Sequence, residues 1–286
     1  MKPAAFEYHA PESVDDAAGL LSSHEDAKVL AGGQSLVPMM SFRLARPAGI
    51  VDINGIADLD YIRCEGGALQ IGATARQTAV EDSSEVAAQA PLLVAATGHV
   101  GHRAIRNRGT LAGSVAHNDP ASEYPAVLMA LGASVTAVSS AGSRVLSVED
   151  LVSGHFLSTA LGPDELITEV SVPAQSGGHG FAEFARRHGD FAVAGAAAVV
   201  TMNGTGVASA SITAFGGTSP ARLDEAEGAL VGSDGGSEAV AEAAARAAAQ
   251  FPTTDDIHGS ADYRRALIDV LTRQALQQAI AQAQEV

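Results

Sequence analysis

The sequence predicts an α+β protein in two parts, the first mixing short strands with helices and the second placing its strands before its helices. In the first part, short apolar stretches alternate with helical patterns around two glycine loops, at 31–36 and 110–114. A stretch rich in Gly and Ser at 173–180 is the best candidate boundary, and three strand patterns followed by three helical patterns come after it. At 286 residues the chain is long enough for more than one core.

The first part should begin with a helix over roughly 14–22, because Ser13 is a suitable N-cap and apolar residues recur on one face behind it. Strands are predicted where apolar or alternating stretches are short, at 28–31, 50–53, 69–73, 134–138 and 165–172. Further helices are predicted at 83–98, interrupted at Pro91, at 126–131 and at 148–152.

The second part should hold a three-stranded sheet covered by helices on one face. Its strands are predicted at 181–184, 192–202 and 207–215, with a turn at 203–206. Its helices are predicted at about 222–231, 237–250 and 262–283. In the last of these, apolar residues from Tyr263 to Ala279 recur at helical spacing and form a stripe that should face the sheet.

The two glycine loops carry the clearest binding signal. Gly32 and Gly33 follow a predicted strand directly, where glycine permits positive φ and lets the backbone touch a ligand. Free N–H groups in such a turn form a concave nest that holds an anion such as a pyrophosphate. The second loop adds the hydroxyls of Thr110 and Ser114. Either loop alone could be an ordinary tight turn.

Composition excludes several classes of function. The net charge is −16, with 33 acidic against 17 basic residues, which argues against nucleic acid and anionic membranes as partners. No apolar run reaches the roughly 20 residues of a membrane span, and the N-terminus lacks a signal region, so we expect a cytoplasmic protein. Cys64 is the single cysteine, so this chain cannot supply the thiolates of an iron–sulfur cluster.

Three longer motifs then become informative: AGGQSLVPMM at 31–40, IRNRGTLAGSVAHNDPASEYP at 105–125 and RRHGDFAVAGAA at 186–197. Through them, and over essentially its whole length, the chain resembles the FAD-carrying medium subunits of molybdenum hydroxylases. That group contains carbon monoxide dehydrogenase and bacterial nicotine and other N-heterocycle hydroxylases. The resemblance implies a two-part FAD-binding domain of the vanillyl-alcohol-oxidase/PCMH type at 1–176, with subdomains of about 1–55 and 56–176. A smaller α+β domain of the CO dehydrogenase flavoprotein type would follow at 177–286.

The resemblance also implies which residues bind FAD. The first loop would contact the pyrophosphate and the neighbouring ribitol or ribose, with the preceding strand leading into it: Lys28, Val29, Leu30, Ala31, Gly32, Gly33, Gln34, Ser35 and Leu36. The second glycine loop would contact FAD from the other side through Thr110, Ala112, Gly113 and Ser114. Relatives usually have glycine where this chain has Ala112, and an extra Cβ would crowd the ligand if the position required positive φ or a direct approach of the ligand.

Five further residues are candidates with open alternatives. Glu123 matches an acidic residue that accepts hydrogen bonds from the adenosine part of FAD in relatives, or it is a solvated carboxylate at a helix start. Asp119 is a ligand contact or an N-cap, and His117 contacts the flavin or is a packed or capping residue. Asp190 and Phe191 match a stretch whose aromatic residue, often Tyr, lies near the isoalloxazine in relatives. Phe191 could equally be a core residue at a strand start.

Three functions are compatible with this sequence. The first is the FAD subunit of a heteromeric molybdenum hydroxylase, which passes electrons from the iron–sulfur clusters of a partner chain to an external acceptor during hydroxylation, with an N-heterocycle as the expected substrate. Its partners would be an iron–sulfur small subunit and a large subunit with the molybdenum cofactor, in a heterotrimer or a dimer of heterotrimers. The second is a free-standing FAD-dependent oxidoreductase with its own substrate pocket. The third is a scaffold that has lost its flavin.

No catalytic residue and no metal site is predicted in this chain. His99, His102, His155, His179 and His258 lack the spacing of metal ligands. Arg106 and Arg108, just ahead of the second loop, could neutralise a pyrophosphate, face a partner or lie on a solvated face.

Overall fold

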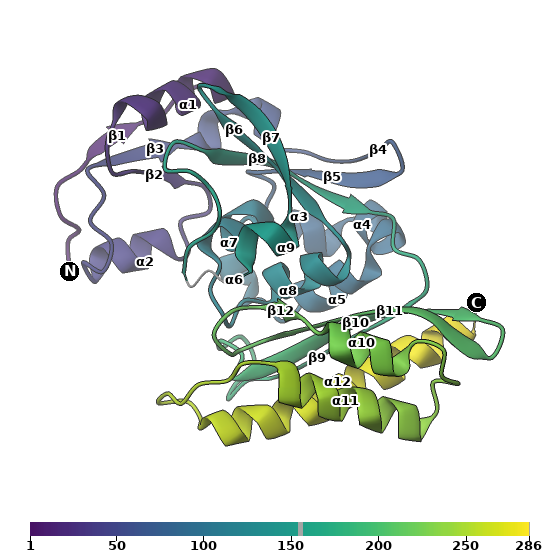
Figure 1. Ribbon diagram of the computed structural model, residues 1–286. Coiled ribbons are helices and arrows are strands. Elements are labelled where there is room, and N and C mark those ends of the chain that lie inside the picture. The colour runs from purple at the N-terminus through teal and green to yellow at the C-terminus, as the bar shows by residue number, and fades with distance from the viewer. Residues whose placement is uncertain (154–156, 286) are drawn as a thin grey trace.

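The computed structural model describes residues 1–153 and 157–285, in which three β-sheets are joined and covered by helices (Figure 1). The first sheet is parallel, with strand order β1-β3-β2. Its strands are β1 (Glu7–His9), β2 (Ala27–Leu30) and β3 (Gly49–Asp52). The helix α1 (Val14–Ser23) joins β1 to β2 and α2 (Leu36–Ser41) joins β2 to β3, the short crossovers that parallel strands require. As predicted, Ser13 caps α1 by accepting a hydrogen bond from the Asp16 N–H.

The second sheet is antiparallel, with order β4-β5-β8-β6-β7. Its strands are β4 (Ile62–Glu65), β5 (Ala68–Gly72), β6 (Ser134–Ser139), β7 (Gly142–Ser147) and β8 (Leu166–Pro173). The expected strands at 69–73, 134–138 and 165–172 are confirmed to within one residue or so at each end. The two edge strands β4 and β7 were not predicted, because their side chains are mostly exposed and polar and show no apolar alternation.

A group of helices lies between the second sheet and the third (Figure 1). Its members are α3 (Gln77–Asp82), α4 (Ser84–Gln89), α5 (Pro91–Thr97), α6 (Arg103–Arg106), α7 (Leu111–His117), α8 (Glu123–Ala130) and α9 (Val148–Val152). The helical pattern predicted at 83–98 is divided at Ala90, with Pro91 in the first turn of α5, where its missing N–H costs nothing. Two single 3-10 turns, at Ile53–Gly55 and Ala57–Leu59, precede β4.

The third sheet is also antiparallel, with order β12-β11-β10-β9. The three expected strands are confirmed as β9 (Gly178–Phe184), β10 (Ala194–Asn203) and β11 (Gly206–Phe215), and the two-residue strand β12 (Ala221–Arg222) extends the sheet by one. The three expected helices are confirmed as α10 (Asp224–Leu230), α11 (Ser237–Gln250) and α12 (Ala261–Gln284).

Alternation along β9 explains how the third sheet is covered on both faces. Gly178 and Gly180 face α12, and a Cβ at either would overlap the carbonyl oxygens of Ala279 and Ala275. Phe181 points the other way and joins the core of the first part. The sheet therefore lies between α12 on one side and α5 and α8 on the other (Figure 1).

Two hydrogen bonds fix the third sheet to the helices of the first part. The Thr213 hydroxyl donates to the Ala126 carbonyl at 2.9 Å, and the Gly216 N–H donates to the Pro120 carbonyl at 2.7 Å. Both carbonyls belong to α8 or the turn before it, and that turn borders the cavity described below. None of the described helices combines the length and apolar character needed to cross a membrane.

We predict that Gly180→Ala destabilises the fold by roughly 2–3 kcal/mol, because the new methyl group forces α12 away from β9. The measurement is the free energy of unfolding in urea. The matched control is Gly228→Ala in α10, where a Cβ meets nothing within 4 Å, so that variant should gain about 0.5–1 kcal/mol. Equal stability of the two variants would contradict this account of the helix–sheet contact.

Candidate functional site

A cavity of about 690 Å³ lies between the parallel sheet, the helices α7 and α8, and the loop before β10. This volume is in the range of sites for cofactors and other small molecules. Nearly all of the residues singled out from the sequence line it: Lys28, Val29, Ala31, Gly32, Gly33, Gln34, Ser35, Leu36, Thr110, Ala112, Gly113, Ser114, His117, Asp119, Glu123, Asp190 and Phe191. The exception is Leu30, a half-buried residue at the end of β2 that is not in the cavity wall.

The first glycine loop presents its backbone to the cavity. Gly33 has φ of +70°, the left-handed region that favours glycine. Among the hydrogen bonds of the described residues, none uses the backbone N–H of Gly32, Gly33, Gln34 or Ser35 as a donor. Four successive N–H groups without an intramolecular acceptor, at a turn after a strand, form the kind of nest that binds anionic groups.

The second glycine segment is a helix start and not a loop. Thr110 is the N-cap of α7 and accepts a hydrogen bond from the Gly113 N–H at 3.1 Å. Ala112 lies in the first turn of this helix, so the position does not need positive φ, and its methyl group belongs to the apolar core. Positive φ is therefore no obstacle to alanine at position 112. Because Ala112 lines the cavity, the prediction that its Cβ crowds a ligand that approaches directly still stands as a prediction.

The two glycine segments touch each other through their backbones. A Cβ at Gly32 would lie 2.5 Å from the Arg108 carbonyl oxygen and 2.6 Å from the Gly109 Cα. Since real Cβ atoms do not approach backbone atoms so closely, only glycine fits at position 32. This contact places the nest and the start of α7 on the same wall of the cavity.

Two residues that the sequence analysis missed hold this contact in place. The Asn54 side-chain amide donates to the Ala31 carbonyl at 2.8 Å and accepts from the Arg76 guanidinium at 2.7 Å. The same guanidinium donates to the Arg108 carbonyl at 2.8 Å. Asn54 directly follows the strand predicted at 50–53, where nothing in the sequence marks it as a site residue. No pattern around Arg76 marks its role either, because its partners are 22 and 32 residues away.

Asp52 supports the Asn54 side chain from the end of β3. Its carboxylate accepts hydrogen bonds from the Asn54 amide and from the Tyr8 hydroxyl, both at 2.6 Å. Burial pushes the pKa of Asp52 upward, but the hydrogen bonds from Tyr8 and Asn54 outweigh it and leave that pKa below its usual value. The carboxylate is therefore charged at neutral pH and orients Asn54 toward the loop.

Neither arginine ahead of the second segment serves as a free cation in the cavity. Arg106 is buried and makes two hydrogen bonds of 2.9 Å to the Glu81 carboxylate. Arg108 is exposed, and its contribution to the site is its carbonyl oxygen. Of the histidines considered as metal ligands, His155 lies outside the described residues.

His117 and Asp119 lie together at the cavity wall, with the His117 Nε2 3.9 Å from the Asp119 carboxylate. Asp119 accepts a hydrogen bond from the Ala121 N–H at 2.9 Å and forms a turn. The residue at the N-cap of α8 is Ser122, so the alternative that Asp119 caps this helix was wrong.

Glu123 is the first residue of α8 and is only 6% exposed, so the alternative of a solvated carboxylate was also wrong. Burial raises the pKa of its carboxyl to about 8, and the nearby charges of Glu183 and Asp119 add to the effect. At neutral pH Glu123 is mostly protonated. A buried neutral carboxyl at the cavity wall offers a ligand one hydrogen-bond donor and an acceptor.

Asp190 and Phe191 reach the cavity from the second part of the chain, in the loop between β9 and β10. Gly189, with φ of +84°, brings this loop against His102, and a Cβ there would lie 2.5 Å from the His102 ring. Phe191 is 72% exposed, which contradicts the alternative of a core phenylalanine. The cavity is therefore complete only when both parts are in place.

Comparison with known proteins shows the same two parts. Residues 4–175 match the family described as the FAD binding domain in molybdopterin dehydrogenase, and residues 179–279 match the CO dehydrogenase flavoprotein C-terminal domain.

Similarity to individual proteins extends over nearly the whole chain. The alpha subunit of the 6-hydroxypseudooxynicotine dehydrogenase complex of Paenarthrobacter nicotinovorans is 43% identical, covering 99% of this chain and 97% of the relative. The nicotine 6-hydroxylase medium subunit of the same organism is 38% identical, covering 98% and 99%. Carbon monoxide dehydrogenase from Hydrogenophaga pseudoflava, in a form lacking the Mo-pyranopterin moiety, superposes with a TM-score of 0.95 at 37% identity over 99% of each chain.

The buried Glu123 predicts a specific pH dependence for the chain freed of ligand. Between pH 4.5 and about 8 the unfolded chain has released a proton that the folded chain keeps on Glu123, so wild-type stability falls as pH rises through this window. Glu123→Gln lacks this fall and should become the more stable protein near pH 8, by roughly 4 kcal/mol.

The measurement is the free energy of unfolding in urea at several pH values in this window. Glu85→Gln, which changes an exposed glutamate in the first turn of α4, controls for the loss of one acid. If the curves of Glu123→Gln and wild type ran parallel from pH 5 to pH 8, Glu123 would not be a buried neutral acid.

Proposed function

The chain belongs to the family of FAD-carrying medium subunits of molybdenum hydroxylases, and from that premise we propose which residues hold the flavin, which chains it works with and which substrates they oxidise. When bound, FAD supplies the electron exchange between the iron–sulfur clusters of a partner chain and an external acceptor. The protein's own residues bind and orient the cofactor, and we assign none of them a bond-making step.

The observation that carries the proposed binding site is the contact between the two glycine segments beside four free N–H groups. We propose that the N–H groups of Gly32, Gly33, Gln34 and Ser35 hold the pyrophosphate. No arginine lines the described cavity wall, so the backbone dipoles, together with the Lys28 ammonium in that wall, supply the complementary charge. Leu30 supports the loop from β2 without touching the cofactor, and the remaining lining residues named above complete the site.

The ends of the cavity are assigned by resemblance and supported by burial. Glu123, buried and protonated, is proposed to hydrogen-bond the adenosine part of FAD, for which a carboxyl with both a donor and an acceptor is suited. Phe191 is proposed to lie near the isoalloxazine with Asp190, and its exposed ring is free to cover the flavin. Without a hydroxyl, Phe191 acts by contact and not by hydrogen bonding.

The proposed partners rest on the relatives, which are named as subunits of larger enzymes, and the cysteine count of this chain is compatible with them. Its single cysteine, Cys64, cannot ligate an iron–sulfur cluster alone. We propose an iron–sulfur small subunit and a large molybdenum-cofactor subunit, assembled in the cytoplasm as a heterotrimer or as a dimer of heterotrimers. The proposed domains are 1–176 and 177–286, supported by the separate family matches at 4–175 and 179–279.

The proposed substrate class of the assembled enzyme is N-heterocycles. Two of the relatives are named for nicotine-derived substrates, at 43% and 38% identity. The substrate site itself belongs to the large subunit, so this proposal is about the complex in which the chain works.

The test is to purify the tagged chain from its native host and compare its visible spectrum with a gel. Flavin and iron–sulfur absorption together with two further polypeptides would support the heteromeric hydroxylase. That preparation should then reduce an artificial acceptor with nicotine or quinoline and not with carbon monoxide. Turnover of carbon monoxide alone would overturn the substrate proposal, and a single yellow chain that turns over by itself would overturn the heteromer.

Flavin retention tests the proposed site directly. Gly32→Ala should bind FAD roughly 10- to 100-fold more weakly, because its methyl group pushes the two glycine segments apart at a cost of about 1–3 kcal/mol. The measurement is the flavin content after gel filtration and the affinity for added FAD. Gly19→Ala, in α1 with nothing within 4 Å of its Cβ, is the control and should keep wild-type affinity. Wild-type affinity in Gly32→Ala would place the flavin elsewhere.

A further inference from the structure

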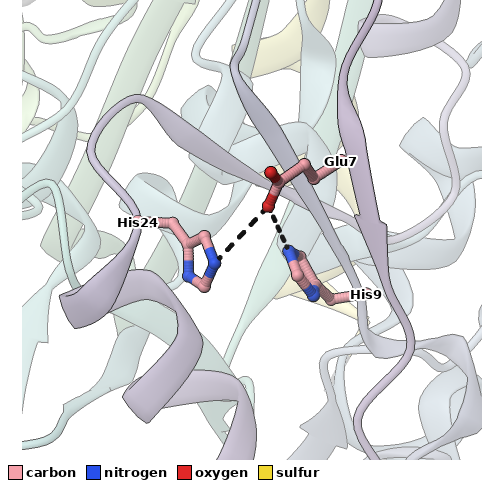
Figure 2. A group of neighbouring side chains, drawn as sticks. All are labelled: Glu7, His9 and His24. Carbon is pink, nitrogen blue, oxygen red and sulfur yellow. Dashed lines mark ion pairs between the residues drawn. The ribbon is translucent and has the colours of Figure 1, made fainter.

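A cluster of three side chains lies at the outer side of the parallel sheet, apart from the cavity. Glu7 and His9 come from β1, and His24 is the C-cap of α1 (Figure 2). Their nearest ligand atoms all lie within 4.8 Å of one another. We propose that Glu7, His9 and His24 bind one divalent transition-metal ion of the Zn²⁺ type, a site that goes beyond the flavin function of the chain.

The distances suit such an ion. The Glu7 Oε2 atom is 3.5 Å from the His9 Nε2 and 3.7 Å from the His24 Nε2. Ligands about 2.0–2.2 Å from a tetrahedral zinc ion lie about 3.4 Å from one another. The two imidazole rings stand 4.6 Å apart, tilted at 53°, on either side of the carboxylate (Figure 2). Small side-chain rotations are enough to bring all three donors onto one ion.

His24 is already oriented as a metal ligand. Its Nδ1 is 3.0 Å from the Leu20 carbonyl oxygen and 3.0 Å from the Ser23 hydroxyl, and that hydroxyl donates to the Gly19 carbonyl at 2.8 Å. With its proton on Nδ1, His24 donates to the Leu20 carbonyl and keeps the Nε2 lone pair for a metal ion. Metal-binding histidines characteristically donate their second ring N–H in this way. The backbone is held as well, because the His24 N–H donates to Leu20 and its carbonyl accepts from the Ala27 N–H at 3.2 Å.

His9 supplies the second observation that points to a ligand. Its Nε2 is buried and makes no hydrogen bond among the described residues, and its near neighbour, the Glu7 carboxylate, is 3.5 Å away. Alternation along β1 puts Glu7 on the same face, while Tyr8 points away and donates to Asp52. A metal ion between these side chains would satisfy the His9 nitrogen.

The charge around the cluster favours a cation. Among the described residues, the ion pairs of Glu7 are with the two histidines alone, and no Lys or Arg neutralises it. The chain as a whole carries −16, which draws cations to its surface. Two imidazoles and one carboxylate are a donor set for zinc and its neighbours and not for Mg²⁺ or Ca²⁺, which prefer oxygen alone.

The bound ion would connect β1 to the end of α1, next to the strand that leads into the first glycine loop. Because Glu7 is 71% exposed and the two histidines are partly so, solvent reaches the cluster and water can fill the remaining coordination position. Because the ion would link β1 to α1, it would stabilise the parallel sheet. Because the cluster lies outside the cavity wall, the ion would not contact the flavin.

The test is calorimetric titration of ZnCl₂ into the untagged full chain loaded with FAD and freed of metal by a chelator. We expect one equivalent to bind with micromolar or better affinity, and to raise the melting temperature. His9→Gln and His24→Gln should each weaken binding by roughly 100-fold or more, and Glu7→Gln, at an exposed position, should also weaken it. His258→Gln, which removes an exposed histidine outside the cluster, should bind as the wild type does.

Flavin absorbance and circular dichroism establish that each variant is folded, and X-ray absorption of the zinc-loaded chain should report two imidazole ligands. Wild-type affinity in both histidine variants would overturn the proposal. So would the absence of a micromolar site in the wild type. If the histidine variants fail to fold, Glu7→Gln decides, because wild-type affinity in that variant would remove the carboxylate from the site.

Discussion

The backbone contact between Gly32 and the Arg108–Gly109 segment is the constraint on which the site depends. It joins the turn after β2 of the parallel sheet to the segment between α6 and α7, in the group of helices inserted between β5 and β6 of the antiparallel sheet. A contact made only of backbone atoms has little dispersion energy to hold it, so the polar bridge from Ala31 through Asn54 and Arg76 to Arg108 is what keeps the two segments in register. The bridge is only partly buried, and its Arg76–Arg108 hydrogen bond is exposed, so it holds the wall by several linked hydrogen bonds and not by burial.

A second constraint is the sharing of one core by both parts of the chain. Phe181, Ala197 and Phe215 belong to strands of the third sheet but pack with the apolar residues of the first part. Phe181 and Phe215 stack with ring centroids 5.8 Å apart. The opposite face of the same sheet has its own cluster with α10, α11 and α12. Glycine and alanine let the sheet fit between two helical layers, since a larger side chain at Gly178 or Gly180 would collide with α12.

Much of the fold could be predicted because the spacing of apolar residues along the sequence indicates which side chains are buried. The helices at 148–152 and 237–250 and the strands of the third sheet have clear apolar patterns and were found at or near their true bounds. The edge strands β4 and β7 and the short helices α2, α3 and α6 lack a clear apolar pattern of their own, and the last three have no side-chain cap. The helix α7 does begin with a capping residue, Thr110, but it lies in a segment that was predicted to be a loop. The residues of the cavity wall followed from motifs, but Asn54, Arg76 and the cluster of Glu7, His9 and His24 did not. Their members are neighbours in space and not in sequence, and the burial of Glu123 likewise depends on packing around α8.

The loop that carries Asp190 and Phe191 gives the cavity a wall from each part of the chain. A ligand that contacts both walls stabilises the association of the two parts of the chain by part of its own binding free energy. By reciprocity, whatever loosens the docking weakens the ligand by the same factor. The hydrogen bonds from Thr213 to Ala126 and from Gly216 to Pro120 belong to that docking, so weakening them would also weaken the ligand. A partner chain that presses on the outer helices could tune cofactor affinity without ever reaching the cofactor.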